Sequence, residues 1–159
     1  MRRLLKFMHT IGAIGLMGSM ACLLVLLALS PAPTSLAEYA LIRGAMGAIA
    51  TWIFQPSLLL TLVAGLLAIA VNRAYHNAGW ALVKLATGIL IFEWSLVGVL
   101  GPMQAEAERS ADAVAGQVTP VMLAESPSAE RNTLWMMLAI ATANVVFGVW
   151  RPRLSKLPD

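Results

Sequence analysis

Four long apolar segments separated by shorter polar ones make up the hydropathy pattern of this chain. The first, residues 4–30, contains no ionisable side chain other than Lys6 and His9 near its start and the thiol of Cys22. A helix needs about 20 mostly apolar residues to cross roughly 30 Å of hydrocarbon, so a segment of this length predicts a transmembrane helix. Similar segments follow at residues 40–71, 80–101 and 132–150. The segment 40–71 is longer than a membrane needs, so we expect it to tilt or to begin above the lipid, where Arg43 could reach water. The pattern therefore predicts an all-α membrane protein with four transmembrane helices.

Prolines and short polar segments separate these helices. Pro31 and Pro33 end the first helix, because proline lacks a backbone donor and disfavours helix at the residue before it. A polar turn at 72–79 joins the second and third helices, and Pro56 predicts a kink in the middle of the second. Short connections place consecutive helices side by side, so we expect one four-helix transmembrane domain over residues 1–159, in an up-down-up-down antiparallel bundle.

The segment 102–131 differs from the rest of the chain because it contains five of the eight acidic residues, interleaved with Ala, Ser and Pro. We expect the third span to end at Gly101 and Pro102 and the segment to form a water-exposed loop, with a short surface helix at 104–115. Most lysines and arginines flank the opposite ends of the helices. By the positive-inside rule, both termini and the 72–79 turn are expected to be cytoplasmic, and the acidic loop periplasmic or extracellular.

Composition excludes several classes of function. Of the 159 residues, 59% are hydrophobic and only 12% are charged, unlike a soluble domain, so the lipid bilayer is the first expected partner. The net charge of +3 comes from basic residues at helix ends and does not indicate nucleic-acid binding. A single cysteine, Cys22, excludes an internal disulfide and a multi-cysteine metal site within one chain. The motifs of nucleotide-binding loops, zinc proteases and serine hydrolases are also missing from the sequence.

Two polar side chains inside the predicted spans are candidates for ligand binding. His9 lies near the start of the first span and Lys84 lies four residues after Trp80, so in an antiparallel bundle both are within about 10 Å of the same interface. A neutral imidazole is a good ligand for iron or zinc, and an ammonium group pairs with anions. The alternatives are a histidine that only forms a hydrogen bond within the bundle and a lysine that extends to lipid headgroups. Trp52 and Trp94, which lie deeper, are candidates for lining a cofactor pocket.

Glu93 is the deepest carboxylate of the predicted spans. It follows Lys84 by nine residues, about 180° around the helix, so the two side chains cannot share a face. Because a buried carboxylate needs a partner or a proton, we expect Glu93 to pair with Arg43, Thr61 or Asn144, or with another subunit. The alternatives are a neutral, hydrogen-bonded acid and a group that transfers protons.

Three short motifs in the first three spans are similar to a known family. They are Lys6-Phe7-Met8-His9, then Gln55-Pro56 followed by Thr61-Leu62-Val63-Ala64-Gly65-Leu66, and Gly79-Trp80 followed by Val83-Lys84-Leu85. Together they resemble the bacterial membrane protoporphyrinogen IX oxidases. The same pattern is similar to a related group of uncharacterised integral membrane proteins and to copper-resistance membrane domains. The segment 30–37 and the acidic segment before the fourth span lie outside this resemblance.

The resemblance implies a heme b site in a bacterial inner membrane protein. His9 would be the axial ligand of the iron, and Lys84 would be a catalytic and heme-binding residue. Lys84, Arg73 or Arg3 would lie near the propionates, with Trp80 also at the heme. The implied activity is electron transfer between a small organic substrate and another membrane carrier, of which oxidation of protoporphyrinogen IX is one example.

Two other functions remain open at this point. One is a non-catalytic accessory or assembly subunit that docks against a larger membrane complex, or a homo-oligomer, through its glycine-rich helix faces and acidic loop. The other is a small metal or solute permease, which the sequence disfavours because it has no row of intramembrane carboxylates or methionine pairs.

Overall fold

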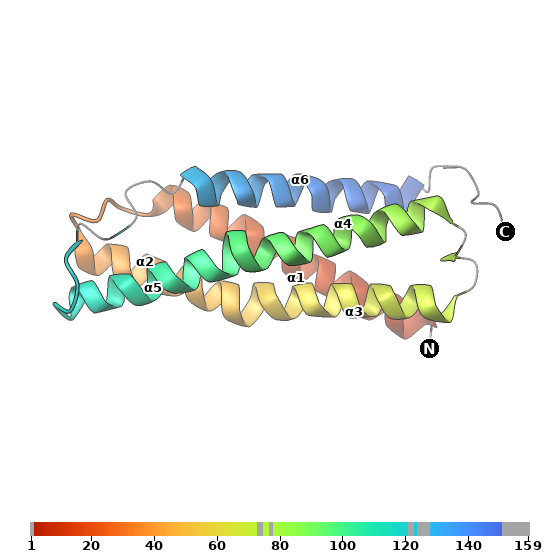
Figure 1. Cartoon of the computed structure of the whole chain (residues 1–159), viewed down its shortest axis with the longest axis horizontal. Helices are drawn as coiled ribbons and strands as arrows, with labels where there is room; N and C mark the ends of the chain where they lie inside the picture. The colour runs from red at the N-terminus through yellow and green to blue at the C-terminus, as the bar shows by residue number, and fades with distance from the viewer. Residues whose placement is uncertain (1, 73–74, 77, 121–122, 124–127, 151–159) are drawn as a thin grey trace.

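Four helical columns pack side by side and antiparallel in the computed structural model, which describes residues 2–72, 75–76, 78–120, 123 and 128–150 (Figure 1). This described part of the chain contains no strand, and the predicted all-α four-helix bundle is confirmed. The first column is α1 (Arg2–Leu29) and the last is α6 (Ser128–Trp150). The second column consists of α2 (Leu36–Ile49), a π-helical turn η1 (Ala50–Phe54) and α3 (Gln55–Val71). The third consists of α4 (Gly79–Ser95), a π-helical turn η3 (Leu96–Leu100) and α5 (Gly101–Val114).

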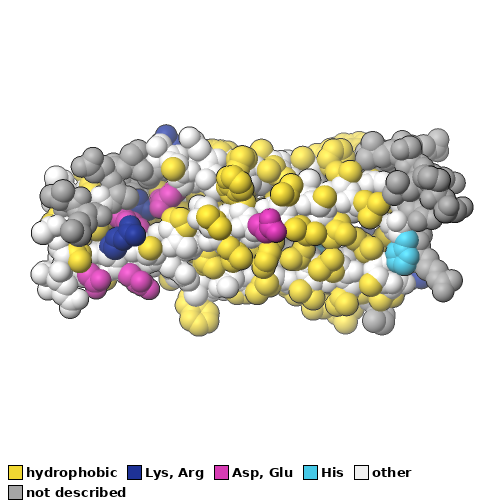
Figure 2. Space-filling model, viewed as in Figure 1, with side chains coloured by type: hydrophobic (Ala, Val, Ile, Leu, Met, Phe, Trp, Pro, Cys, Tyr) yellow, Lys and Arg dark blue, Asp and Glu magenta, His cyan; other side chains and the backbone are white. Residues whose placement is uncertain are grey.

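Each of the four columns is long and apolar enough to cross a membrane. They contain 28, 36, 36 and 23 residues, and at 1.5 Å per residue even the shortest exceeds roughly 30 Å. Figure 2 shows hydrophobic side chains over the middle of the visible face and most of the visible acidic side chains at the end where α5 terminates. These features indicate an integral membrane protein.

The third column does not end at Gly101 and Pro102, where the sequence predicted its end. It continues through α5 to Val114, and the π-helical turn η3 comes immediately before this Gly-Pro pair. The second column repeats the arrangement, with η1 immediately before Gln55 and Pro56. A proline ring clashes with the carbonyl four residues earlier, which in both columns belongs to the π-helical turn. The wider turn gives the ring room, so each helix passes through its proline without ending.

The first half of the predicted acidic loop is a packed helix. Met103, Glu106, Ser110 and Ala113 are buried along one face of α5, at spacings of three and four residues. This face packs against α2, and the two helices lie side by side in Figure 1. The expected helix at 104–115 is present, but the prediction that the segment is exposed throughout was wrong, because charge content was taken to mean exposure on every face. The exposed charged residues all lie on the other faces of the helix: Glu108, Arg109 and Asp112.

Two glycines of α1 allow it to approach α3 closely. A Cβ atom added at Gly12 would lie 2.8 Å from the backbone nitrogen of Thr61 and 2.9 Å from the carbonyl oxygen of Ser57. A Cβ at Gly15 would collide with the hydroxyl group of Ser57. In lipid, where apolar surface gains little from association, such close backbone packing is a main source of helix affinity. The contact holds the start of α1, including His9, directly against α3.

Candidate functional site

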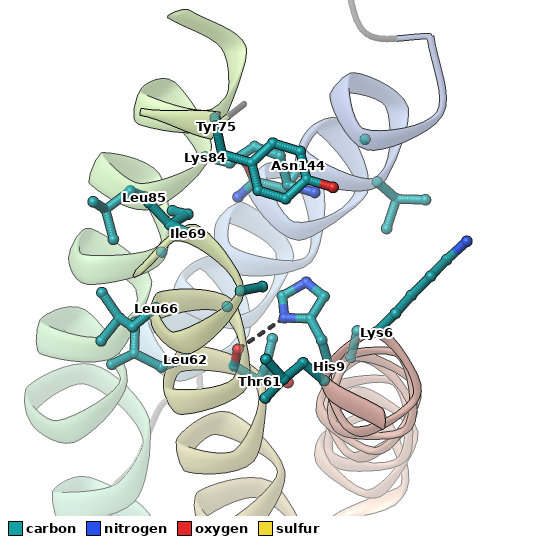
Figure 3. Close-up of a pocket in the computed structure, with 18 of the residues that line it drawn as sticks. Lys6, His9, Thr61, Leu62, Leu66, Ile69, Tyr75, Lys84, Leu85 and Asn144 are labelled. Carbon is teal, nitrogen blue, oxygen red and sulfur yellow. Dashed lines mark hydrogen bonds between the residues drawn. The ribbon is translucent and has the colours of Figure 1, made fainter. Parts of the chain in front are cut away.

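His9 is oriented by a hydrogen bond to the backbone of α3. Its Nδ1 atom lies 2.8 Å from the carbonyl oxygen of Thr61. Because a carbonyl oxygen only accepts, Nδ1 carries the proton and Nε2 of the neutral ring keeps its lone pair. The Thr61 hydroxyl does not compete, since it donates to the Ser57 carbonyl at 2.7 Å. Figure 3 shows the second ring nitrogen of His9 pointing away from Thr61, towards the space below Tyr75.

A cavity of about 500 Å³ lies beside this imidazole, where α1 and α4 begin and α3 ends. Its volume is within the range of small-molecule sites, about 300–1,000 Å³. Leu62, Leu66, Ile69 and Leu85 form an apolar wall on one side in Figure 3. The polar and aromatic side chains that line the cavity come from all four columns and the turn before α4: Arg2, Arg3, Lys6, His9, Thr61, Asn72, Tyr75, Trp80, Lys84 and Asn144.

Lys84 lines the same cavity as His9, from the opposite side of the bundle. Its side chain extends from α4 to α6, where a Cβ added at Gly148 would lie 2.8 Å from Nζ. Gly148 therefore leaves room for the ammonium group. Asn144, one turn earlier on α6, accepts a hydrogen bond from the Thr87 hydroxyl at 2.8 Å and also lines the cavity. The structure thus brings together the imidazole and the ammonium group that the sequence placed at a common depth.

Trp80 also lines the cavity and packs edge-on against Tyr75, with ring centroids 5.4 Å apart and an interplanar angle of 76°. Edge-to-face packing of this kind stabilises both rings in fixed positions. Arg73, which was expected near a cofactor carboxylate, lies outside the described residues. Arg3 does line the cavity, whereas the second histidine, His76, is exposed and bonds to the Ile69 carbonyl through Nε2.

Trp52 and Trp94 do not line the cavity, contrary to the sequence prediction. They are 77% and 56% exposed and lie on the outer surface of the bundle. The prediction used depth along the helix, which does not say which face of the helix a residue occupies.

None of the predicted in-bundle partners of Glu93 pairs with it. Arg43 forms an ion pair with Glu130, Asn144 bonds to Thr87, and the Thr61 hydroxyl bonds within its own helix. Glu93 itself is exposed on the outer face of α4.

A second group of polar side chains, which the sequence analysis missed, lies at the opposite end of the bundle. Tyr39 donates to Glu106 at 2.7 Å, and Arg43 donates to Glu130 at 2.6 Å. The guanidinium group of Arg43 also lies 5.2 Å from the centre of the Tyr39 ring. Arg43 and Glu106, expected near or in water, are only 1% and 2% exposed. These contacts connect α2, α5 and α6.

The sequence did contain a signal for this polar cluster. Tyr39, Arg43, Met46 and Gly47 recur at spacings of three and four residues and form the buried face of α2. An arginine on such a face is packed inside the bundle, and the acidic residues of the following segments are its natural partners.

The described residues contain no group of three or more His, Cys, Asp or Glu side chains that could hold a metal ion. That part of the chain therefore does not form a zinc site, which requires three or four protein ligands. His9 alone could still be the axial ligand of a heme iron, because the porphyrin supplies four nitrogen donors and one proximal histidine is enough.

The cavity is the feature from which a function can be inferred. A comparison of the chain with protein-family models, with curated proteins and with solved structures finds no match in any of the three. The inference therefore depends on one imidazole with an available Nε2, an apolar wall, and several cationic side chains around the same space.

Proposed function

We propose that this chain binds heme b in the cavity beside His9 and acts as a membrane redox protein. The observation that supports the proposal most strongly is the orientation of His9. Histidines that ligate metals usually donate their other ring N–H to a carbonyl or carboxylate, which selects the tautomer and fixes the ring. His9 donates from Nδ1 to the Thr61 carbonyl and presents Nε2 to the cavity.

The residues present fit an amphipathic ligand with carboxylates. The Leu62, Leu66 and Leu85 side chains offer an apolar surface for a flat ring. The basic side chains of the cavity, at the start of α1 and on α4, are suited to pair with two propionates: Arg2, Arg3, Lys6 and Lys84. Heme, when bound, supplies one-electron transfer chemistry, while the protein orients it and limits access of water.

Lys84 is our candidate for a catalytic role. Lys84 lines the cavity from α4, with its ammonium group beside Gly148 of α6, where it can hold a carboxylate of the substrate or of the cofactor. We infer a small organic reductant as substrate, with an oxidase activity like that on protoporphyrinogen IX as the leading example. The electrons would pass on to another carrier in the membrane.

We place the cavity at the cytoplasmic face of a bacterial inner membrane. Arg2, Arg3 and Lys6 lie at this end of the bundle, and the sequence adds Arg73 after α3 and Arg151, Arg153 and Lys156 after α6. The exposed basic residues described near the other end are Arg109 and Arg131. This asymmetry satisfies the positive-inside rule.

A reduced-minus-oxidised absorption spectrum of the protein purified from heme-supplied cells tests the proposal. We expect a Soret band and an α-band that are lost in His9→Ala and retained in His76→Ala, the matched control at the exposed histidine. A colourless, folded wild-type protein that does not take up added hemin would contradict heme binding. Recovery of that colourless protein with a fixed partner would instead support the accessory-subunit alternative.

A further inference from the structure

Glu93 has an unusual position for a carboxylate, in the middle of the third column and on the outer face of the bundle. It lies 14 residues after the start of α4 at Gly79, or about 21 Å along the helix. Its side chain is exposed, and so are those of its neighbours Leu90, Trp94 and Val97, the last by 80%. The carboxylate therefore lies among lipid-facing apolar side chains, at a depth where a membrane contains no water.

A carboxyl group at this position needs a proton or a partner, and the described residues of the chain offer it no partner. Ionisable side chains in transmembrane segments are costly to expose to lipid and normally face a bundle interior, a cavity or each other. No described residue forms an ion pair or hydrogen bond with Glu93, and Lys84 lies about 180° away around α4. Arg43 is buried against Glu130.

The side chains around Glu93 form a continuous seam along α4 and into the π-helical turn η3, which contains Val97. Five exposed residues follow one another at spacings of three, four, three and four, the repeat by which two helices pack against each other. We call them the α4 seam: Val83, Ala86, Leu90, Glu93 and Val97. Apolar exposure alone is expected of any helix in lipid, but a carboxylate in the centre of the seam is not.

We propose that the α4 seam is the contact surface for a second copy of this chain, with the two Glu93 carboxyl groups meeting at the interface. Copies inserted in the same orientation are related by a two-fold axis along the membrane normal, so each seam residue meets its own counterpart at its own depth. Two adjacent carboxyl groups share a proton, and one then donates a hydrogen bond to the other. Polar side chains of this type hold transmembrane helices together.

No exposed basic residue of the described helices lies at the depth of Glu93, so none of them can pair with it across a symmetric interface. The exposed ones lie near helix ends: Arg2, Arg3 and Lys6 on α1, Arg109 on α5 and Arg131 on α6. In a symmetric pair formed through α4, the ionisable group at the depth of Glu93 is therefore Glu93 of the second copy. Since Lys84 points the opposite way, this contact leaves the His9 cavity open and is independent of heme binding.

Disulfide cross-linking of the full-length chain in native membranes tests the seam directly. In a Cys22→Ala background, we expect Leu90→Cys and Val97→Cys each to form a covalent dimer on oxidation. Val63→Cys, at an exposed position of α3, is the matched control and should remain monomeric. All of these positions are on the outer surface, so folding is not at risk.

Substitution of Glu93 tests the role of the carboxyl group. In the Leu90→Cys chain, Glu93→Leu should lower the cross-linked fraction about fivefold or more, whereas Glu93→Gln, which can still form a reciprocal hydrogen bond, should retain it. Glu93→Lys alone should dimerise poorly, but should pair with a differently tagged wild-type copy when the two are co-expressed.

Three outcomes would overturn the proposal. The first is equal cross-linking at Val63→Cys. The second is a dimer fraction that Glu93→Leu does not change. The third is that Leu90→Cys forms no self-dimer and instead cross-links stoichiometrically to a different membrane protein. A helix of that other protein, with a basic or hydrogen-bond donor group, would then occupy the seam.

Discussion

The Nδ1 atom of His9 lies 2.8 Å from the carbonyl oxygen of Thr61, and this single contact determines what the imidazole can do. It joins the first column to the second, selects the tautomer and leaves Nε2 available in the cavity. It depends on the close approach of α1 and α3 at Gly12 and Gly15. Helix packing and ligand chemistry are therefore coupled at this end of the bundle.

Gly12→Ala should separate α1 from α3. The added Cβ would come within 3 Å of the α3 backbone, which cannot move as a flexible side chain can, so we expect a loss of about 1–3 kcal/mol in the free energy of unfolding. Gly18→Ala is the matched control because no atom lies within 4 Å of its added Cβ. Unfolding of both variants in mixed detergent micelles measures the difference. Equal stability of the two variants would contradict close packing at Gly12.

Arg43→Met should be strongly destabilising because it leaves Glu130 without its cationic partner. Removing one partner of a buried ion pair costs about 3–5 kcal/mol, because the other charge stays buried without compensation. The double variant Arg43→Met with Glu130→Gln should recover a large part of this loss, since neither charge then remains. Arg109→Ala, which removes a largely exposed guanidinium group 3.6 Å from Glu106, should cost about 1 kcal/mol or less. A double-mutant cycle that shows no coupling between Arg43 and Glu130 would argue against the pair.

Tyr39→Phe removes only the hydroxyl group that donates to Glu106. The tyrosine and the carboxylate are both buried, so we expect a loss of about 1.5–3 kcal/mol, typical of a hydrogen bond to a charged group. The free energy of unfolding is again measured in mixed detergent micelles. Tyr75→Phe is the control, at a tyrosine that is only partly buried. A loss no greater than that of the control would mean that this bond contributes little.

Lys84→Met should weaken retention of heme about tenfold or more, because a charge-assisted contact to a propionate contributes about 1.5–3 kcal/mol. Glu93→Gln should leave retention unchanged, since Glu93 lies on the opposite face of α4. Hemin titrations of the two purified variants give both affinities. Equal weakening by both substitutions would contradict the assignment of Lys84 to the cavity.

Hydropathy was sufficient to predict the four columns and their antiparallel order, because an apolar segment long enough to cross the hydrocarbon predicts a transmembrane helix. It did not predict the continuation of the third column into α5. Pro102 and the acidic residues after it suggested an end, whereas a π-helical turn accommodates the proline and the acidic helix buries one face.

Depth along a helix could be read from the sequence, but depth alone does not give the direction of a side chain. His9 and Lys84 share a cavity, as their matched depth suggested, whereas Trp52, Trp94 and Glu93, which lie deeper in the spans, face outwards. Arg43 was expected to extend to water from the end of its span and is instead buried. Its spacing from Tyr39 and Met46 carried that information.

Titration of hemin into purified His9→Gly protein, with and without added imidazole, tests the central claim most directly. We predict that wild-type protein gives a saturable Soret band at one heme per chain, that His9→Gly does not, and that free imidazole restores the band by occupying the vacated space beside Thr61. A His9→Gly protein that binds hemin with the wild-type spectrum and stoichiometry, without imidazole, would show that His9 is not the ligand.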